Sequence, residues 1–385
     1  MNLLIISHTP HYLKDGIIQG WGSTVREIDH LAALFDQVTH LAPLHSEPNP
    51  ASSLAYTNPK INFIPVKPAG GKSIFQKLAI LWRIPSWLAA IRKELFKADS
   101  VHIRCPAVIS LVALLAFRLW GRGKPCWVKY AGNWQPQSKE PLSYTIQRAW
   151  LSKNRHRGVV TVNGHWPAQP AHVFPFNNPS LTLNEVQAAA ELSKHKAISE
   201  PLELIFVGRL EDAKGVSRII QVAKLLAGIP VDFHLTLIGD GPQRSAFEAQ
   251  VVRAALQDRV SFVGWKRRAE INDYYTKAHI ILLPSEASEG WPKVLSEAMA
   301  FGAVPLASDV SSIPQVLNKT GAGKAIPPSD VEAYLEAILF FYANPQSWQA
   351  ASAAGKKASL EYTYEHYLHN VQKLFSSHWN INLTL

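Results

Sequence analysis

The chain has 385 residues, of which 47% are hydrophobic and 18% are charged. This length suits two compact α/β domains of about 150 to 200 residues each, and the composition excludes a disordered or fibrous protein. The two cysteines, Cys105 and Cys126, are too few for a disulfide framework and lack the neighbours of a zinc site, so we expect both to be buried free thiols. The chain starts on a strand-like segment without a leader, and no apolar run approaches about 20 residues, which favours a cytoplasmic protein.

Positive charge is concentrated in the first half. Residues 1–180 contain 20 Lys and Arg against 8 Asp and Glu, whereas residues 181–385 contain 19 against 21. A basic half favours contact with nucleic acid, an anionic membrane surface or a phosphorylated substrate. Cations alternate with apolar side chains between residues 72 and 97, which predicts an amphipathic helix pair interrupted at Pro85. This pair either rests on anionic lipid headgroups or is an ordinary surface element with a basic outer face.

Short apolar runs alternate with segments of helical period along the chain, the pattern of parallel sheets wound with βα units. Helices of the first half are expected to begin near Ser23, Ile74, Ala107 and Leu142. The predicted strands are Leu3–Ile6, Val38–Leu41, Ile61–Ile64, Val101–Ile103, Trp127–Tyr130 and Val159–Thr161. Residues 1–176 therefore form a doubly wound, Rossmann-like domain, which we expect to bind the acceptor.

The pattern breaks near Phe176, and the polar, alanine-rich residues 177–200 are predicted to be a linker. A second Rossmann-like domain is predicted for residues 201–345, with strands at Leu204–Val207, Leu235–Ile238, Val260–Phe262, Ile280–Leu283 and Val304–Leu306. Residues 346–385 are predicted to be helical, with an apolar face that packs back on the first domain. Ligands bind at the carboxyl ends of such strands, so two domains facing across a cleft are expected to hold two substrates.

The segment FVGRLEDAKG, residues 206–215, lies between a predicted strand and a helix that begins near Val216. Arg209 and Lys214 then stand at the carboxyl end of the strand. A guanidinium, an ammonium and the helix amides behind them suit a diphosphate. Basic loop residues are commonly just solvated, so this segment alone does not decide between the two interpretations.

A second segment runs from residue 284 to residue 302. Pro292 suits the first position of a helix, which places Glu289 in the preceding turn and Glu297 on the second turn. A carboxylate accepts two hydrogen bonds, which suits the paired hydroxyls of a ribose or a hexose. The alternative for Glu297 is a solvated helix carboxylate beside an apolar stripe.

The turn before this predicted helix offers further groups to an anion. The amides of Gly290 and Trp291 suit a phosphate. Lys293 adds an ammonium beside the helix N-terminus, which either binds a donor phosphate or the carboxylate of an acidic sugar, or is an ordinary surface lysine.

In their order and spacing these segments resemble the retaining glycosyltransferases of the GT-B fold, the large group that includes glycogen synthases, sucrose synthases and bacterial lipid mannosyltransferases. The matching stretches are Phe206–Leu210 with Lys214-Gly215, Leu237–Pro242, Phe262–Gly264, the Glu-x7-Glu from Glu289 to Glu297, and Ala298–Ala300 with Gly302 and Pro305. The resemblance implies that Arg209 and Lys214 bind the donor diphosphate, that Glu297 binds the nucleotide ribose and that Glu289 binds the transferred sugar. It places Gly264 and Lys266 near the base.

The first domain carries the resemblance more faintly. Where the family has a Gly-Gly pair near the donor phosphates, this chain has Gly20-Trp21-Gly22-Ser23. Gly22 still allows a backbone amide to approach a phosphate. Trp21 either narrows the acceptor side or packs the loop, and we favour packing.

Many members of this group carry a histidine that reaches the sugar at the end of the strand formed here by residues 126–130, and this chain has none there. Asn133 or Lys129 is the substitute donor that we expect. His8 and His11, in the loop after the first strand, either face the same cleft on the acceptor side or are solvated loop histidines.

The resemblance implies a retaining, metal-independent hexosyltransferase without a cofactor, which moves a sugar from a nucleotide diphosphate sugar to a carbohydrate or lipid-linked acceptor in polysaccharide or glycolipid assembly. We expect it in the cytoplasm, at the inner face of the membrane where its basic half contacts anionic lipid, and without a nucleic-acid partner. The alternatives are a phosphorylase or epimerase of the same fold, or a non-catalytic membrane-associated or regulatory protein. A dinucleotide oxidoreductase is disfavoured because no Gly-x-Gly-x-x-Gly follows the first strand of either half.

Overall fold

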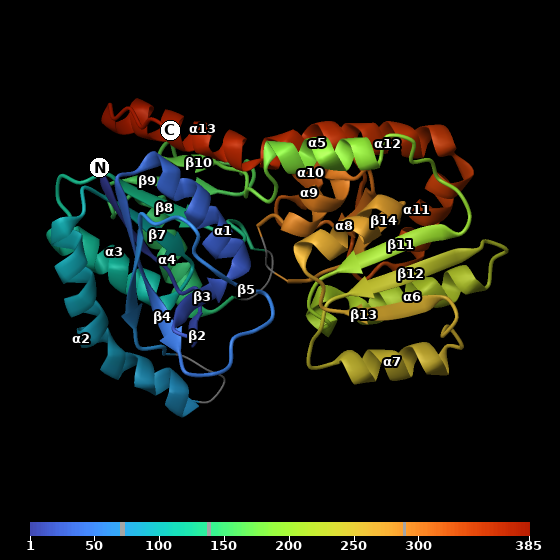
Figure 1. Ribbon diagram of the computed structural model, residues 1–385, viewed down its shortest axis with the longest axis horizontal. Helices are drawn as coiled ribbons and strands as arrows, with labels where there is room; N and C mark the ends of the chain where they lie inside the picture. Colours follow the sequence, from blue (N-terminus) through green and yellow to red (C-terminus); the bar gives the residue numbers. More distant parts are fainter. Residues whose placement is uncertain (70–73, 137–139, 288–289) are drawn as a thin grey trace. The chain divides into compact units, whose positions relative to one another are not determined.

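The computed structural model describes residues 1–69, 74–136, 140–287 and 290–385. The chain divides into two compact units, Met1–Phe176 with Leu368–Leu385, and Asn177–Tyr367. Each unit is built on a largely parallel sheet with helices between successive strands, and the elements are labelled in Figure 1. Two Rossmann-like α/β units, as the alternating pattern predicts, are therefore present.

The sheet of the first unit has the strand order β10-β9-β8-β7-β1-β4-β2-β3-β5, and β6 also pairs with β4. Its strands are β1 (Asn2–Ile6), β2 (His11–Lys14), β3 (Ile17–Trp21), β4 (Gln37–His45), β5 (Ser53–Ala55), β6 (Ile61–Val66), β7 (Ser100–Cys105), β8 (Cys126–Tyr130), β9 (Val159–Val162) and β10 (Val173–Pro175). The pairs β2–β3 and β3–β5 are antiparallel and the others are parallel. The sequence did not predict β2, β3, β5 and β10, because these short strands are partly exposed and lack the apolar runs of the central strands.

The helical elements of this unit are α1 (Gly22–Leu31), η1 (Ala32–Leu34), α2 (Ile74–Lys97), α3 (Val108–Trp120) and α4 (Leu142–Ser152). The predicted interruption at Pro85 is wrong, because α2 continues through it as a single helix. Trp87, Ile91 and Leu95 keep one buried face at a spacing of four residues directly after the proline. Burial of this stripe offsets the hydrogen bond that the proline removes.

The C-terminal helix α13 spans Tyr364–Trp379, and its residues from Leu368 onward belong to the first unit. The ring of Phe375 lies 5.8 Å from that of Phe35, and the ring of His378 lies 4.7 Å from that of Phe174. The preceding helix α12 (Pro345–Ser359) belongs to the second unit, where the indole of Trp348 donates to the carbonyl of His279 at 2.9 Å. The second unit thus extends well beyond residue 345, where its end was predicted.

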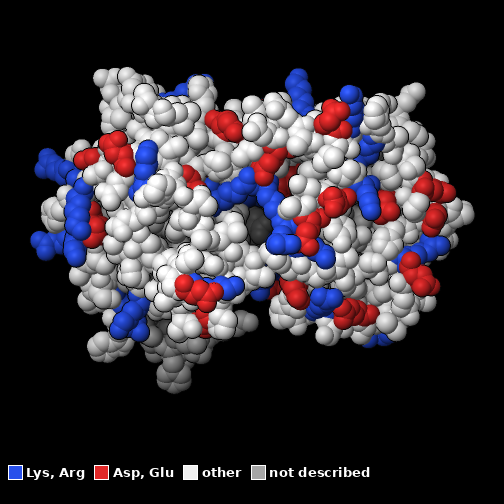
Figure 2. All heavy atoms as spheres, viewed as in Figure 1, with Lys and Arg blue, Asp and Glu red and all other residues white. Residues whose placement is uncertain are grey.

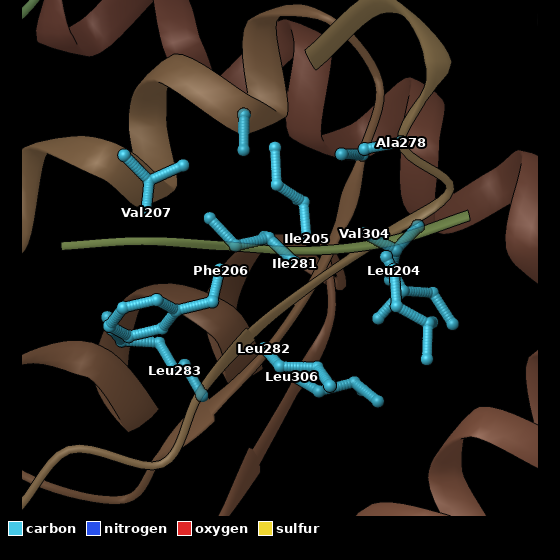
Figure 3. Close-up of a cluster of buried hydrophobic side chains, with 14 of the residues drawn as sticks. Leu204, Ile205, Phe206, Val207, Ala278, Ile281, Leu282, Leu283, Val304 and Leu306 are labelled. Carbon is cyan, nitrogen blue, oxygen red and sulfur yellow. The ribbon is translucent and has the colours of Figure 1, made fainter. Parts of the chain in front are cut away.

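The sheet of the second unit has the order β13-β12-β11-β14-β15-β16, and every pair is parallel. Its strands are β11 (Leu202–Val207), β12 (Phe233–Ile238), β13 (Val260–Gly264), β14 (Ile280–Leu283), β15 (Val304–Ser308) and β16 (Lys324–Ile326). Figure 3 shows Ile205 and Val207 on one side of β11 and Leu204 and Phe206 on the other. All four side chains are buried, because helices cover both faces of a parallel sheet.

The helical elements of the second unit are α5 (Leu183–Leu192), η2 (Asp212–Lys214), α6 (Val216–Ala227), α7 (Arg244–Arg253), α8 (Arg268–Lys277), α9 (Lys293–Ala300), α10 (Ile313–Thr320), α11 (Val331–Ala343), α12 and η3 (Leu360–Tyr362). The predicted linker, residues 177–200, is therefore not a simple connection, since it contains α5. Thr182 and Glu185 cap this helix reciprocally, and Val186 and Ala189 are buried in the apolar cluster of the unit. Its alanine-rich composition suits a helix as well as it suits a linker.

None of the helices in the described ranges is both long enough and apolar enough to cross a membrane.

Candidate functional site

The strand order of the second unit reverses between β11 and β14. From β11 the chain proceeds outward through β12 to β13, and it then returns to the other side of β11 at β14 and proceeds through β15 to β16. The loops that follow β11 and β14 lie at this reversal, at the carboxyl edge of the sheet, where ligands of such sheets bind. These two loops, residues 208–215 and 284–292, are the two segments for which the sequence predicts a site.

Backbone contacts hold the loop after β11 against its neighbours. The amides of Gly208 and Leu210 donate to the carbonyls of Ile238 and Asp240, both at 3.0 Å. A Cβ on Gly239 would lie 1.8 Å from the carbonyl oxygen of Gly208, and Gly239 has a φ of +133°. Only glycine allows this approach, so the Gly239-Asp240-Gly241 turn is a packing requirement of the site loop.

The same loop is joined to the loop after β14. Gly215 has a φ of +84°, and a Cβ there would lie 2.2 Å from the carbonyl oxygen of Pro284. The carbonyl of Ala213 accepts hydrogen bonds from the amide of Glu286 at 3.0 Å and from the hydroxyl of Ser285 at 3.3 Å. The two predicted segments therefore meet at one edge of the sheet.

Arg209 and Lys214 both lie on this loop. The side chain of Arg209 is 70% exposed, and its Nη2 lies 2.6 Å from Oε1 of Glu211, an ion pair that solvent screens. Lys214 ends η2, and α6 begins after Gly215 with no side-chain cap on its first turn. An exposed arginine, a lysine and an uncapped helix N-terminus thus lie at the carboxyl edge of the sheet, an arrangement that attracts an anion.

Glu297 lies on α9, at the other side of the strand-order reversal. Its Oε1 accepts a hydrogen bond from Nη1 of Arg268 at 3.0 Å, and its Oε2 accepts one from the hydroxyl of Tyr275 at 3.3 Å. The Glu297 side chain is 17% exposed. It is thus a fixed, partly buried carboxylate and not the solvated helix residue of the alternative interpretation.

The turn before α9 is well anchored. The indole of Trp291 is buried and stacks on the ring of Tyr362 with 4.9 Å between centroids, and the carbonyl of Gly290 accepts from the hydroxyl of Ser312 at 2.6 Å. Pro292 caps α9 and does not occupy its first helical position, which Lys293 takes. Pro292 has an extended ψ of 119°, so the helix begins one residue later than predicted.

Glu289, which is predicted to hold the transferred sugar, lies outside the described residues. Lys293 is partly buried in the first turn of α9. Gly264 ends β13 with a φ of +74°, and its carbonyl accepts from the amide of Gly239 at 2.9 Å. Gly264 therefore lies next to the turn after β12, and Lys266, two residues later, is partly buried.

Gly22 is predicted to let a backbone amide approach a phosphate. Its amide donates to the carbonyl of Ser52 at 3.0 Å, so this amide is already used within the first unit. A Cβ at this position would lie 2.6 Å from that same carbonyl oxygen. The glycine is therefore required for the contact between α1 and β5. Trp21, predicted to pack the loop, is 53% exposed.

His11 is likewise a structural residue. It lies in β2 and not in a loop, is fully buried, and contacts the carbonyl of Thr9 at 2.9 Å and the hydroxyl of Tyr56 at 2.8 Å. The Tyr56 hydroxyl also lies 2.5 Å from Nδ1 of His40, whose Nε2 lies 2.8 Å from the hydroxyl of Ser7. Burial lowers the pKa of His11 to about 4, so it is neutral at pH 7. It is unavailable to an acceptor, whereas His8 is exposed.

The predicted substitutes for the missing histidine are both buried. Nζ of Lys129 lies 2.6 Å from Oε1 of Glu27, and Nη1 of Arg104 lies 2.7 Å from the same oxygen. Lys129 is therefore engaged in an ion cluster. Asn133 is 6% exposed, and its Oδ1 accepts from the amide of Gln135 at 3.1 Å.

Sequence reasoning missed Arg268 and Tyr275, the two partners of Glu297. Arg268 stands in a run of three basic residues, 266–268, whose charge gives no sign of which one turns inward. Arg268 and Tyr275 are both distant from Glu297 along the chain, so no local sequence pattern links them to it. Within the described ranges no group of three His, Cys, Asp or Glu residues is arranged to bind a metal.

Comparisons with known proteins agree with this architecture. Residues 189–358 match the model of the family described as glycosyl transferases group 1. The amylovoran biosynthesis glycosyltransferase AmsK of Erwinia amylovora is 32% identical over 171 residues, which are 42% of this chain and 42% of AmsK. The putative colanic acid biosynthesis glycosyltransferase WcaL of Escherichia coli K12 is 32% identical over 152 residues, 38% of this chain and 37% of WcaL. The chain thus spans about two fifths of the length of these relatives.

Among solved structures, sucrose-phosphate synthase from Thermosynechococcus elongatus superimposes with a TM-score of 0.69 at 19% identity and covers 98% of both chains. Anabaena Alr3699/HepE in complex with UDP superimposes with a TM-score of 0.70 at 17% identity and covers 98% of this chain and 100% of its own. The protein therefore has the GT-B fold. Residues 189–358, which contain the loop after β11 and helix α9, form a domain of the glycosyl transferases group 1 family.

Proposed function

We propose that the protein is a retaining glycosyltransferase that moves a sugar, most simply a hexose, from a nucleoside diphosphate to an acceptor hydroxyl. The observation that carries this proposal is the edge of the second sheet, where Arg209 and Lys214 share a loop with an uncapped helix N-terminus beside the loop that leads to Glu297. The named relatives AmsK and WcaL are glycosyltransferases.

The two cations stabilise the negative charge that develops on the leaving group. When the bond between the sugar and the diphosphate breaks, negative charge grows on the diphosphate oxygens. Arg209 and Lys214 neutralise it together with the first amides of α6. Two cations and a helix N-terminus supply the positive charge that a divalent metal would, so we propose that the reaction needs no metal and no cofactor.

Glu297 is proposed to bind the ribose of the donor and Glu289 the hydroxyls of the sugar. The acceptor hydroxyl attacks on the face from which the diphosphate departs, and the departing phosphate oxygen takes the hydroxyl proton, so the anomeric configuration is retained. The Glu-x7-Glu spacing supports this part of the proposal. We do not assign Glu289 and Glu297 the roles of nucleophile and acid that retaining glycosidases give to two carboxylates about 5 Å apart. In the described residues the groups bonded to the Glu297 carboxylate are Arg268 and Tyr275.

The acceptor is proposed to be a growing glycan or its lipid-linked precursor. The names of AmsK and WcaL refer to amylovoran and colanic acid biosynthesis. The basic first unit suits an acceptor that carries phosphate or lies at an anionic surface.

A thermal-shift titration tests the donor site. UDP, GDP and ADP with their glucose or mannose esters are added to the full chain, and a ligand at about 100 times its Kd is expected to stabilise the protein by about 2.7 kcal/mol. Arg209→Ala and Glu297→Ala are expected to abolish the shift. The matched control is Arg253→Ala, an exposed arginine at the end of α7. Unaltered shifts in both site variants would overturn the donor site.

Product analysis then tests the reaction class. Release of nucleoside diphosphate in step with glycoside formation, in the presence of a chelator, supports a metal-independent transferase. Sugar phosphate as the product would show a phosphorylase, and an altered nucleotide sugar would show an epimerase. Nucleotide binding without turnover on any acceptor would favour a regulatory protein.

We also propose that α2 and α3 form the surface that contacts an anionic membrane. Figure 2 shows Lys and Arg gathered at the left edge, where Figure 1 places these two helices. The acidic Glu94 of α2 is buried and paired with Lys97. Large apolar side chains are exposed between the cations: Leu81 (62%), Trp82 (86%), Phe96 (59%), Leu115 (44%) and Leu119 (59%). An exposed face of apolar and basic residues suits lipid headgroups.

Vesicle sedimentation tests this surface. Binding to vesicles of phosphatidylglycerol and phosphatidylcholine is expected, with little binding to phosphatidylcholine alone. Each basic residue near the surface contributes about 1 kcal/mol, so the double variant Arg92→Glu/Lys93→Glu is expected to bind at least about 30-fold more weakly. Trp82→Ser is expected to weaken binding as well, and Arg253→Glu is the control. Equal binding by all variants would refute the proposal.

A further inference from the structure

We propose that Arg268 is a positioning residue for donor binding. It fixes the plane of the Glu297 carboxylate, and it thereby gives nucleotide recognition its dependence on the ribose hydroxyls. This inference rests on the proposed donor function of the second unit, and it concerns a residue that the Glu-x7-Glu pattern does not include.

The contacts at Glu297 are divided between its two oxygens. Nη1 of Arg268 donates to Oε1 at 3.0 Å and the hydroxyl of Tyr275 donates to Oε2 at 3.3 Å. A carboxylate has about four acceptor sites, so each oxygen keeps capacity for a further donor. Because the side chain retains 17% exposure, those remaining sites are open to a ligand hydroxyl. The two protein donors therefore set the direction in which Glu297 presents its lone pairs.

Arg268 is itself held from three segments. Its Nε donates to Oε1 of Glu185 on α5 at 2.9 Å, and its Nη2 donates to the carbonyl of Ser180 at 2.8 Å. With the bond to Glu297, the planar fork of the guanidinium is fixed at each of its three nitrogens. Arg209, by contrast, has 70% of its side chain exposed and, among the described residues, pairs with Glu211. Arg268 is therefore preorganised in a way that the exposed arginine is not.

The segment that holds Arg268 is also tied to α9. The amide of Ser180 donates to the carbonyl of Tyr362 at 2.9 Å, and its hydroxyl lies 2.9 Å from that of Ser296, next to Glu297 in the chain. The ring of Tyr362 stacks on Trp291 at the start of α9. Arg268 and Glu297 are consequently held by the same set of contacts, those of Ser180 and Tyr362 with the start of α9. Their relative orientation is therefore set before a ligand binds.

This arrangement predicts a selective effect. Without Arg268 the carboxylate keeps its charge and one hydrogen bond but loses the stronger, charge-assisted bond that orients it. Contacts that depend on that orientation, those to the ribose hydroxyls, weaken, whereas the diphosphate contacts of Arg209 and Lys214 remain. A merely structural role would instead weaken every ligand to the same degree.

The test compares nucleotide pairs. Isothermal titration of the full chain measures the Kd of UDP, GDP and ADP and of the 2′-deoxy counterpart of each. In the wild type the ribonucleotide of the best pair is expected to bind about tenfold more tightly than its deoxy form. Arg268→Met is expected to bring this ratio close to one, mainly by weakening the ribonucleotide. Arg268→Lys is expected to restore part of the ratio, because an ammonium still reaches the carboxylate but lacks the fork.

Two further variants keep the test decisive. Arg267→Met removes a neighbouring arginine that is 78% exposed and paired with Glu270, and it is expected to leave the Kd and the ratio unchanged. Glu185→Gln weakens the contact that holds Arg268 but leaves Arg268 in place, so it is expected to lower the ratio of ribonucleotide to deoxynucleotide affinity in part. This variant also tests the proposal if Arg268→Met does not fold.

The outcomes separate the inference from the function on which it rests. If Glu297→Ala abolishes discrimination while Arg268→Met and Glu185→Gln retain it, the positioning role is refuted and the donor site stands. A uniform loss for ribo and deoxy nucleotides in Arg268→Met refutes it too and leaves a structural role. If the wild type binds none of the six nucleotides, the proposed function itself falls, together with this inference.

Discussion

Acid should unfold this protein through its buried histidines, and the structure gives the size of the effect. Burial lowers the pKa of His11, His156 and His279 to about 4, from an ordinary value of 6.5. The pKa values of His40 and His102 are lowered by burial as well. All five side chains are at most 5% exposed, so each ring is neutral in the folded state at pH 7.

The sign follows from proton uptake. Between pH 6.5 and pH 4 the unfolded chain binds protons that the folded protein does not, so the free energy of unfolding falls as the pH falls through this window. For a shift from 6.5 to about 4, lowering the pH from 7.5 to 5.0 costs about 2 kcal/mol per histidine. The three together give about 6 kcal/mol, a large part of the 5–15 kcal/mol typical of a folded protein.

Urea denaturation at pH 7.5 and at pH 5.0 measures this difference. His156→Phe is expected to reduce the pH-dependent loss by about 2 kcal/mol, because its ring no longer titrates. His195→Gln, at an exposed position, is the matched control and is expected to change nothing. A wild type that loses less than about 1 kcal/mol between the two pH values would refute the reasoning.

Two packing predictions follow from the loops and from the buried ion cluster. Gly239→Ala forces a Cβ to within 1.8 Å of a backbone carbonyl oxygen at a φ of +133°, so it is expected to destabilise the second unit by about 3 kcal/mol or more in urea denaturation. Gly228→Ala, whose nearest contact is at 3.4 Å, should change stability little, and equal effects of the two would contradict the packing argument. Glu27→Gln removes the carboxylate that Lys129 and Arg104 share in the first unit, and a loss of about 3 to 5 kcal/mol in the same assay is expected; a neutral result would show that the cluster is not a buried ion network.

The sequence by itself determined the elements that depend on local pattern. Continuous apolar runs such as Leu204–Val207 mark strands buried on both faces, and the Gly and Pro residues after them mark the turns at the carboxyl edge. Because ligands of parallel sheets bind at that edge, the sequence alone predicts a site in the loop with Arg209 and Lys214.

Only the tertiary structure decided which groups in those loops remain available. The amide of Gly22 donates to the carbonyl of Ser52, and His11 is buried and contacts the hydroxyl of Tyr56. From the sequence, each of the two is predicted to be an accessible loop residue. Residues 177–200 became part of the second unit because α5 buries an apolar face there. Glu297 accepts a hydrogen bond from Arg268, which is distant from it along the chain. Hydrogen bonds and burial between distant segments leave no local periodicity, so no pattern along the chain records them.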